Sequence, residues 1–417
     1  YINEADVQLK PLGTSFKYRC LQALEAVQPG DIEETAEGIF FRGEKVQYSG
    51  DYLFGFAQDF VKDKRAEEIE AMSQDELAWA ARNYNLEMIK SDLAAVGVHF
   101  GSFVSEKAVH EKGEVAETMQ TLKESGRVYE KDGAQWLETK DFGDDQDRVL
   151  VKSDGAYTYL VPDIAYHHDK FLRGFDRYIN LFGSDHGGYM ARLRAGIATL
   201  GHDEKKLTII LMRLVFLSRH GKRVKFSKRA GNFVAMADVV EEAGADATRW
   251  FMLARSVDSE FEFDMDLALD HSSRNPVYKV LYAHARICTM KDKGTEQGTT
   301  AAADPQAAAE QLTDPLEKDI ILYLADYAQV VERAARELSP HHLPAYLLGL
   351  ADLLNRYYSL ARTDPSFRIL QDENKERQSA RLHLLDAARQ VLANGLSLMG
   401  IQAPERLTRE VEEEVGD

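Results

Sequence analysis

The clearest chemistry in this chain lies in a short basic segment that ends in a glycine and an asparagine, VKFSKRAGN at residues 224–232. It carries Lys225, Ser227 and Lys228 close together. Two lysines on such a loop can hold a polyphosphate as point charges. The serine hydroxyl can donate to a phosphate or can simply stabilise the turn. A solvated basic turn is the ordinary alternative, and the segment alone does not decide between the two.

An alternation of strands and helices precedes that loop and must position it. Short apolar runs typical of strands occupy residues 149–151, 157–161, 178–183 and 207–211, and helical segments lie near 163–173 and 188–200. This order predicts a parallel α/β sheet with crossover connections. Ligands of such sheets bind beyond the carboxyl ends of the strands. Asp163, residues 184–188 and the basic loop are therefore the candidate ligand groups.

The flanking parts of the chain have helical patterns. Apolar spacing predicts helices at 76–97 and 113–125, and Asp132-Gly133 predicts a hairpin turn. Beyond about residue 272, a polar stretch at 291–309 predicts a flexible loop. Three amphipathic helices are expected after it, marked by apolar residues from Leu316 to Leu338, from Tyr346 to Tyr357 and from Leu382 to Leu396.

Composition excludes several classes of protein. The 417 residues allow two or three domains, and no apolar run is long enough to span a bilayer, so no membrane partner is expected. Cys20 and Cys288 are the only cysteines, which excludes a disulfide framework and a cysteine-based zinc site and fits a reducing cytoplasm. The net charge of −18 disfavours indiscriminate nucleic-acid binding but allows a local basic face for a folded RNA.

Several segments together resemble the arginyl-tRNA synthetases, a family of class I aminoacyl-tRNA synthetases. The run KFSKR at 225–229 resembles the second class I signature, usually KMSKS or KMSKR, with Phe226 in place of methionine. The other matching segments follow in the family's order: YINEA at 1–5, DFGDD at 141–145, DRVLVKSDGAYTY at 147–159, DIAYH at 163–167, GSDHG at 183–187, NPVY at 275–278 and YAHAR at 282–286. Together they are far more specific than any one of them.

The resemblance implies a fold and a reaction. The fold would be a Rossmann-like parallel-sheet catalytic domain at 1–270, incomplete at its N-terminus, with an inserted connective region near 66–145. An all-α helical-bundle anticodon-binding domain would follow at 271–417. The activity would be that of an arginine–tRNA ligase, which activates arginine with ATP to arginyl-adenylate and transfers it to the 3′ end of tRNA(Arg).

The resemblance also implies substrate-binding residues. Lys225, Ser227 and Lys228 would be catalytic, and both lysines would bind ATP together with Gly183 and His186. Asn3, Tyr159, Asp163 and His186 would bind arginine, whose guanidinium requires a carboxylate. For Asp163 the alternative is a helix cap, and for His186 it is a helix-start histidine without a ligand. The adjacent His167 and His168 are interpreted as a surface pair, because neighbours on a helix point apart.

In the helical part the matching residues are Tyr282, Arg286, Arg356 and Tyr357, which would bind tRNA. Flat side chains that stack on splayed bases suit loop recognition. The alternative is that tyrosines at helical spacing belong to the core. Mg²⁺ is expected to accompany ATP, no metal-binding residues are assigned, and we expect a cytoplasmic monomer with arginine, ATP and tRNA(Arg) as partners.

The first class I signature, H-I-G-H, does not occur in these 417 residues, which start at Tyr1. We expect from this a truncated chain that lacks the first strand and the N-terminal domain and is inactive alone. The alternative is a non-catalytic tRNA-binding paralogue or fragment of a class I synthetase, which would have no need of Lys225 and Lys228. A ligase of the same class for cysteine would need a zinc–thiolate site, which two lone cysteines cannot build.

Overall fold

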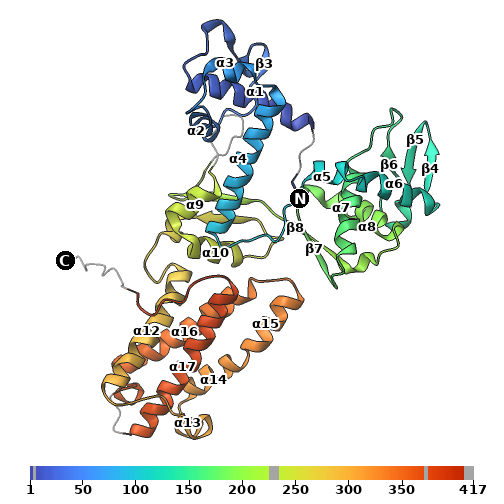
Figure 1. The fold of residues 1–417 in the computed structure, drawn as a ribbon. Coiled ribbons are helices and arrows are strands. Elements are labelled where there is room, and N and C mark those ends of the chain that lie inside the picture. Colours follow the sequence, from blue (N-terminus) through green and yellow to red (C-terminus); the bar gives the residue numbers. More distant parts are fainter. Residues whose placement is uncertain (3–5, 225–233, 371–373, 408–417) are drawn as a thin grey trace. The chain divides into compact units, whose positions relative to one another are not determined.

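The computed structural model describes residues 1–2, 6–224, 234–370 and 374–407, and its chain forms two compact units (Figure 1). Residues 1–94 and 98–214 belong to the first unit, and residues 95–97, 215–224 and those from 234 onward belong to the second.

The first unit begins with a helical layer over a small antiparallel sheet. Its elements are α1 (Asp6–Ala23), β1 (Ile32–Thr35), β2 (Gly38–Phe41), β3 (Glu44–Lys45), α2 (Asp51–Phe60), α3 (Ala66–Ala71) and α4 (Gln74–Ala95). Phe16, Leu53 and Leu77 are fully buried between these helices. The helix predicted at 76–97 is therefore confirmed as α4, with its boundaries shifted by two residues.

The rest of the first unit packs helices against two separate sheets. Its elements are α5 (Glu106–Glu111), α6 (Glu114–Glu124), β4 (Val128–Lys131), β5 (Ala134–Leu137), β6 (Arg148–Val151), α7 (Leu160–Leu172), β7 (Tyr178–Gly183), α8 (Met190–Thr199) and β8 (Leu207–Met212). Strands β7 and β8 pair in parallel, with Tyr178 opposite Leu207. This confirms the expected parallel α/β element, and α8 is its crossover helix.

The hairpin is confirmed as well. Strands β4 and β5 pair antiparallel, and both turn residues have positive φ, 53° at Asp132 and 72° at Gly133. Positive φ at both central residues is the geometry of a two-residue turn that matches strand twist.

The strand predicted at 149–151 forms as β6 but in a different sheet, and the strand predicted at 157–161 was wrong. Strand β6 pairs antiparallel with β5 and is not part of the parallel sheet. Residues 157–161 do not form a strand: Tyr157 makes one isolated bridge to Val151, and α7 starts at Leu160. Pro162 lies in the first turn of α7, where a missing N–H costs nothing and a φ near −65° favours a helix.

The second unit joins a small sheet to a helical bundle. The sheet has the order β10-β9-β11, built from β9 (Val215–Arg219), β10 (Lys222–Arg223) and β11 (Phe261–Asp264), and β9 pairs in parallel with β11. The helices are α9 (Met236–Ala243), α10 (Ala245–Leu253), α11 (Met265–Ala268), α12 (Pro276–Glu296), α13 (Pro305–Gln311), α14 (Pro315–Ala325), α15 (Tyr327–Arg336), α16 (His342–Thr363) and α17 (Lys375–Leu398).

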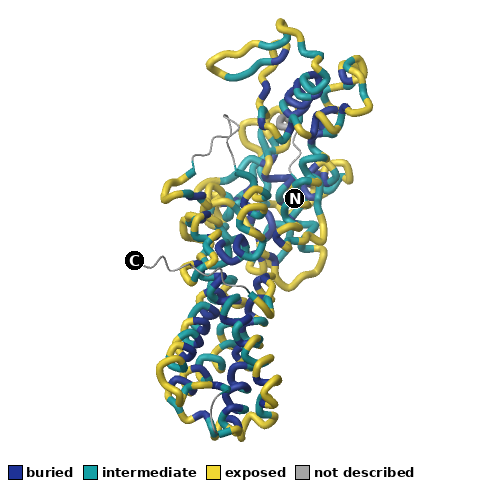
Figure 2. Tube along the Cα trace, turned by 90° about the vertical axis from the view of Figure 1, so that its left-hand side faces the viewer, coloured by how far each residue is buried: buried dark blue, intermediate teal, exposed yellow. Residues whose placement is uncertain are grey.

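One hydrophobic core runs through this unit, from Trp250 and Phe263 near the sheet to Leu350 and Leu392 in the bundle. Figure 2 shows the buried positions along the inner faces of the bundle helices. The fold class expected from the sequence, an α/β part with parallel strands followed by an all-helical part, is thus confirmed.

The flexible loop expected at 291–309 was mostly wrong. Helix α12 continues to Glu296, and α13 occupies Pro305–Gln311 with Asp304 as its N-cap. The first amphipathic helix of the bundle is in fact two helices, α14 and α15, with Asp326 between them. A polar, alanine-rich composition is typical of loops, but it also fits a short helix whose one apolar side is buried, as Ala308 is here.

A buried ion pair holds three helices of the bundle together. Arg381 Nε of α17 donates to Glu317 Oε1 of α14 at 2.7 Å, and the Tyr357 hydroxyl of α16 donates to the same oxygen at 3.0 Å. The Glu317 and Arg381 side chains are almost fully buried, at 1% and 4% exposure. Removing one partner would leave the other charge buried without compensation.

We therefore expect Glu317→Ala to lower the free energy of unfolding by about 3–5 kcal/mol, the usual cost of breaking a buried pair. Urea unfolding followed by circular dichroism measures this change. The control is Glu332→Ala, which removes an exposed i,i+4 pair with Arg336 and should have little effect. Equal effects of the two substitutions would contradict this role of the buried pair.

Candidate functional site

The structure brings together the start of α7 and the turn that follows β7. Asp163 is the fourth residue of α7, and Tyr159 occupies the N-cap position, so the interpretation of Asp163 as the helix cap was wrong. The turn after β7 is a 3₁₀ helix, Ser184–Tyr189, whose Tyr189 hydroxyl donates to Asp163 Oδ2. The His186 ring lies 6.3 Å from the Tyr189 ring.

Close packing of α8 on α7 supports this arrangement. A Cβ on Gly196 of α8 would lie 2.3 Å from the side chain of Ile164, the residue after Asp163. Only a glycine allows the two helices to approach this closely. The start of α7 is therefore held rigidly against its neighbour.

The carboxyl group of Asp163 has an unusual electrostatic environment. Burial raises the pKa of its carboxyl above the ordinary value, and the nearby Glu106 raises it further. The hydrogen bond from Tyr189 and the charges of His186 and Lys170 act in the opposite direction. A partly buried carboxylate under such opposing influences is typical of a functional site.

Glu106 is a residue that reasoning from the sequence missed. It is the first residue of α5, is only 7% exposed, and its charge acts on both Asp163 and the Tyr1 phenol. Its backbone N–H donates to the carbonyl of Ile2 at 3.1 Å, which joins α5 to the beginning of the described chain. In the sequence, Ser105 followed by Glu106 is an ordinary helix start, so only the burial of the carboxylate reveals it.

Tyr1 completes one side of this region. Its ring packs on Tyr166 of α7, with ring centroids 4.6 Å apart. Burial raises the pKa of the Tyr1 phenol, and the charges of Glu106 and Asp163 raise it further. A site with two carboxylates and aromatic rings suits a flat cation such as a guanidinium.

Tyr159 and His186 lie at accessible positions near these groups. The Tyr159 side chain is 64% exposed and the His186 side chain is 55% exposed. Gly183, at the end of β7, leaves room for the turn, because a Cβ there would lie 2.6 Å from Asp185 Oδ1. Asn3, Lys225, Ser227 and Lys228 lie outside the described residues.

The two neighbouring histidines of α7 point apart, as expected, but the interpretation as a surface pair was wrong for one of them. His167 is buried, at 4% exposure, between Asp163 and Asn180. His168 contacts His202, with ring nitrogens 2.7 Å apart. Among the residues that the structure describes, no group of three or more metal-binding side chains is arranged around a common point.

In the helical bundle, the four residues expected to bind tRNA differ in their exposure and their contacts. Tyr282 and Arg286 line a pocket of about 310 Å³ together with Thr289, Met290 and Lys293 of α12. Arg286 lies over the Tyr358 ring, 3.9 Å from its centroid, and Arg356 is exposed on α16.

Tyr357 does not suit the role expected for it. It is 1% exposed, and its hydroxyl donates to the buried Glu317. A ring in this position cannot stack on a base, so for this residue the alternative of a core tyrosine is correct. Its helical spacing with other apolar residues had left both interpretations open.

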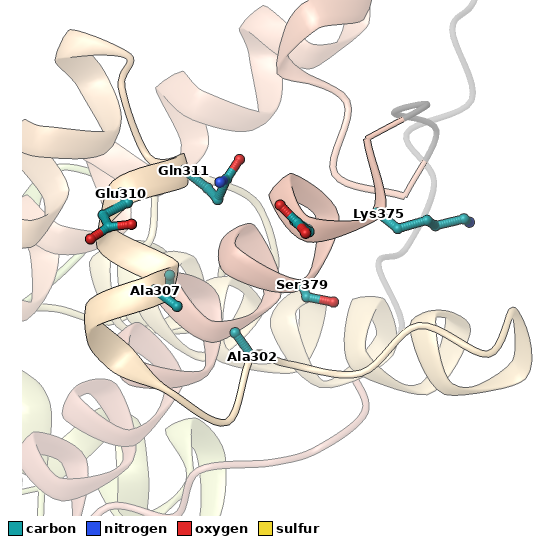
Figure 3. Close-up of a pocket in the computed structure, with 8 residues that line it drawn as sticks. Ala302, Ala307, Glu310, Gln311, Lys375 and Ser379 are labelled. Atoms are coloured by element: carbon teal, nitrogen blue, oxygen red, sulfur yellow. The ribbon is translucent and has the colours of Figure 1, made fainter.

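A second pocket in the bundle lies between α13 and α17, with a volume of about 450 Å³ (Figure 3). The pocket is lined by small residues together with acidic and basic ones: Ala302, Ala307, Ala308, Glu310, Gln311, Lys375, Glu376 and Ser379. None of the residues expected to bind a substrate lines it. None of the helices in the described parts of the chain is long and apolar enough to cross a membrane.

Comparison with known protein families covers most of the chain. The family model for the catalytic domain of class I (R) tRNA synthetases matches residues 36–257, and that for the DALR anticodon binding domain matches residues 280–407. The two matched regions, together with the parallel strands and the helical bundle, define a class I aminoacyl-tRNA synthetase.

Individual relatives indicate the same class of enzyme. Arginine–tRNA ligase 1 of Halalkalibacterium halodurans is 40% identical over 411 residues, which are 98% of this chain and 70% of that protein. The arginine–tRNA ligase of Bacillus subtilis is 38% identical over 408 residues, again 98% and 70%. The chain therefore belongs to the arginyl-tRNA synthetase family, and its function is that of an arginine–tRNA ligase with ATP as a substrate.

Solved structures show the same fold. A Campylobacter jejuni protein assigned as an arginyl-tRNA synthetase superposes with a TM-score of 0.83 at 29% identity, over 98% of this chain and 84% of the other. Thermus thermophilus arginyl-tRNA synthetase superposes with a TM-score of 0.70 at 22% identity, over 94% and 74%.

The buried His167 makes a prediction about pH. Burial, with the charge of Lys170, lowers the pKa of its imidazole from 6.5 to about 4 in the folded protein. Because the folded value lies below the unfolded value, the stability is full above about pH 6.5 and decreases as the pH falls toward 4. The loss should reach on the order of 3 kcal/mol at pH 4.

His167→Gln should remove this part of the pH dependence, because glutamine keeps an acceptor and does not titrate. Urea unfolding at several values between pH 7.5 and 4 measures the slope. His110→Gln, at an exposed position of α5, is the control and should leave the slope unchanged. The same slope in His167→Gln as in the unaltered protein would contradict the assignment.

Proposed function

We propose that the region around Asp163 is the arginine site of this ligase. Asp163 and Glu106 supply two carboxylates for the guanidinium group, and Tyr1 and Tyr159 border it, while Asn3 is assigned to this site on the sequence resemblance alone. The observation that carries this proposal is the pair of largely buried carboxylates that act on each other at the start of α7 and α5. A guanidinium is always charged and presents several N–H donors in one plane, so it can satisfy both acids.

The reaction then needs positions for the other two substrates. The carboxylate of arginine attacks the α-phosphate of ATP, pyrophosphate leaves, and a hydroxyl of the terminal tRNA adenosine takes the arginyl group while AMP leaves. We assign Gly183 and His186 to ATP because Gly183 ends strand β7 and His186 lies in the turn just beyond its carboxyl end. Lys225 and Lys228, with Ser227, are assigned to the phosphates on the resemblance of their loop alone.

The enzyme's contribution is positioning and charge stabilisation. Arginine held by its guanidinium can present its carboxylate in one orientation, which replaces a bimolecular search. Lysines near the departing pyrophosphate would stabilise the charge that develops there. Mg²⁺ would come bound to the ATP phosphates, where it usually keeps several waters.

We propose that the outer face of α12 takes part in binding tRNA(Arg). Arg286 and Lys293 supply positive charge, and Tyr282 supplies a flat ring beside the 310 Å³ pocket. Arg356 is retained as an exposed cation on α16, whereas the buried Tyr357 is not retained. A local basic face of this kind can bind RNA although the whole chain is acidic.

We retain the boundary at 270/271 between the catalytic and anticodon-binding domains, with an inserted region near 66–145. The gap between the two family matches, from 257 to 280, contains this boundary. We also retain the expectation of a monomer in the cytoplasm.

The arginine site can be tested with Asp163→Asn, in protein expressed from its complete reading frame. An unpaired guanidinium in a partly buried site typically costs about 3–5 kcal/mol, so kcat/KM for arginine should fall by at least about 100-fold. ATP–pyrophosphate exchange in the presence of tRNA measures it. Asp169→Asn, which removes a partner of Arg173 on the same helix, is the matched control. Unchanged arginine kinetics in Asp163→Asn with an unchanged melting temperature would remove Asp163 from the site.

The tRNA interface can be tested with Arg286→Gln. Loss of one phosphate contact should weaken tRNA binding and should reduce the slope of log affinity against log salt by about one unit. Filter binding at several salt concentrations gives both quantities. Arg333→Gln, at an exposed position of α15 paired with Glu337, is the control and should change neither. A salt slope unaffected by Arg286→Gln would contradict a phosphate contact there.

A further inference from the structure

Three polar side chains form a hydrogen-bonded chain between α7 and β7 that ends on Asp163. Lys170 Nζ donates to Asn180 Oδ1 at 3.1 Å. The Asn180 amide nitrogen lies 2.5 Å from His167 Nε2, and His167 Nδ1 lies 2.7 Å from the main-chain carbonyl oxygen of Asp163. His167 and Asn180 are buried, at 4% and 6% exposure.

The direction of every hydrogen bond in this chain is determined by chemistry. The ammonium of Lys170 can only donate, so it must face the amide oxygen of Asn180. The amide N–H₂ then faces His167 Nε2, which must accept, and the imidazole proton must sit on Nδ1 and point to the Asp163 carbonyl. Turning the amide over would place donor against donor at Lys170 and acceptor against acceptor at His167 Nε2.

Lys170 is close to Asp163 without being paired to it. The two residues are seven positions apart on α7, which is two turns and about 10.5 Å along the axis. Helical side chains lean toward the N-terminus, so the lysine stem extends toward Asp163. Its Nζ lies over the Tyr166 ring, 4.3 Å from the centroid.

The two charges act on each other across this distance. Lys170 lowers the pKa of Asp163, and Asp163 in turn raises the pKa of Lys170, which burial lowers to about 8. Among the described residues, however, no ion pair joins Lys170 to Asp163, and Asn180 accepts the ammonium instead. An ammonium seated on Asp163 would occupy the place of a substrate cation.

We propose that Asn180, oriented by His167, is a positioning residue that holds Lys170 away from Asp163 and so leaves this carboxylate open to the guanidinium of arginine. The inference rests on the proposed function, in which Asp163 binds arginine. The held lysine still favours the ionised carboxylate, because a Coulomb interaction extends beyond contact distance. Asp163 is thereby kept charged and accessible at the same time.

The test is Asn180→Ala, alone and combined with Lys170→Met, assayed by ATP–pyrophosphate exchange with tRNA present and L-arginine varied. Alanine releases the lysine, which then competes for Asp163. Such a competing internal state should raise the KM for arginine by about 5–30-fold, with kcat almost unchanged. Removing the competitor in the double variant should return KM close to its original value.

A merely structural role predicts the opposite result for the double variant. Losing two hydrogen-bonding groups would then be no better than losing one. A KM that is unchanged in Asn180→Ala, or that stays high in the double variant, overturns the inference. Melting temperatures of all variants show whether each one is folded.

A second variant covers the case in which Asn180→Ala does not fold. Asn180→Leu keeps a similar side-chain volume but removes the acceptor for Lys170, so it should raise KM for arginine as Asn180→Ala does, and an unchanged KM in a folded Asn180→Leu overturns the inference. Asp163→Asn separates the two proposals: if it leaves KM unchanged, the arginine site is wrong, whatever Asn180 does. If it raises KM and the double variant shows no recovery, only the role of Asn180 is wrong.

Discussion

A carboxylate that is largely buried and yet has to stay charged constrains the structure around α7. Burial and the neighbouring Glu106 both favour the neutral form of Asp163, and the Tyr189 hydroxyl, His186 and Lys170 oppose them. These groups come from three places: Glu106 from α5, Tyr189 and His186 from the 3₁₀ turn after β7, and Lys170 from the far end of α7. The close approach of α8 at Gly196 keeps the start of α7 in place among them.

Buried polar groups in the two units differ in how they are paired. In the helical bundle, Arg381 and Tyr357 both donate to Glu317, and Arg381 also donates to the Arg368 carbonyl, so their burial contributes to a defined packing of three helices. Around Asp163, no ion pair within the described part of the chain joins Lys170 to this carboxylate, although their charges influence each other. That difference is expected if the first network serves the fold and the second leaves room for a charged substrate.

Much of the fold was predictable from the sequence. The parallel strands, the hairpin at Asp132-Gly133 and the helical C-terminal part follow from apolar periodicity and turn chemistry, and all are confirmed. Predictions failed where a local pattern fits two structures. Residues 157–161 have the composition of a strand but begin a helix with Pro162 in its first turn, and the polar residues 291–309 include parts of two helices.

The sequence by itself determined the family, through motifs spread along the chain, and it determined which residues were worth attention. Only the tertiary structure decided what surrounds each of them. It buried Tyr357 and His167, which local spacing leaves undecided, and it placed Glu106 near Asp163 although 57 positions separate them in the chain. The physical reason is that burial and charge proximity depend on which elements pack together, and a side chain's own neighbours in sequence do not contain that information.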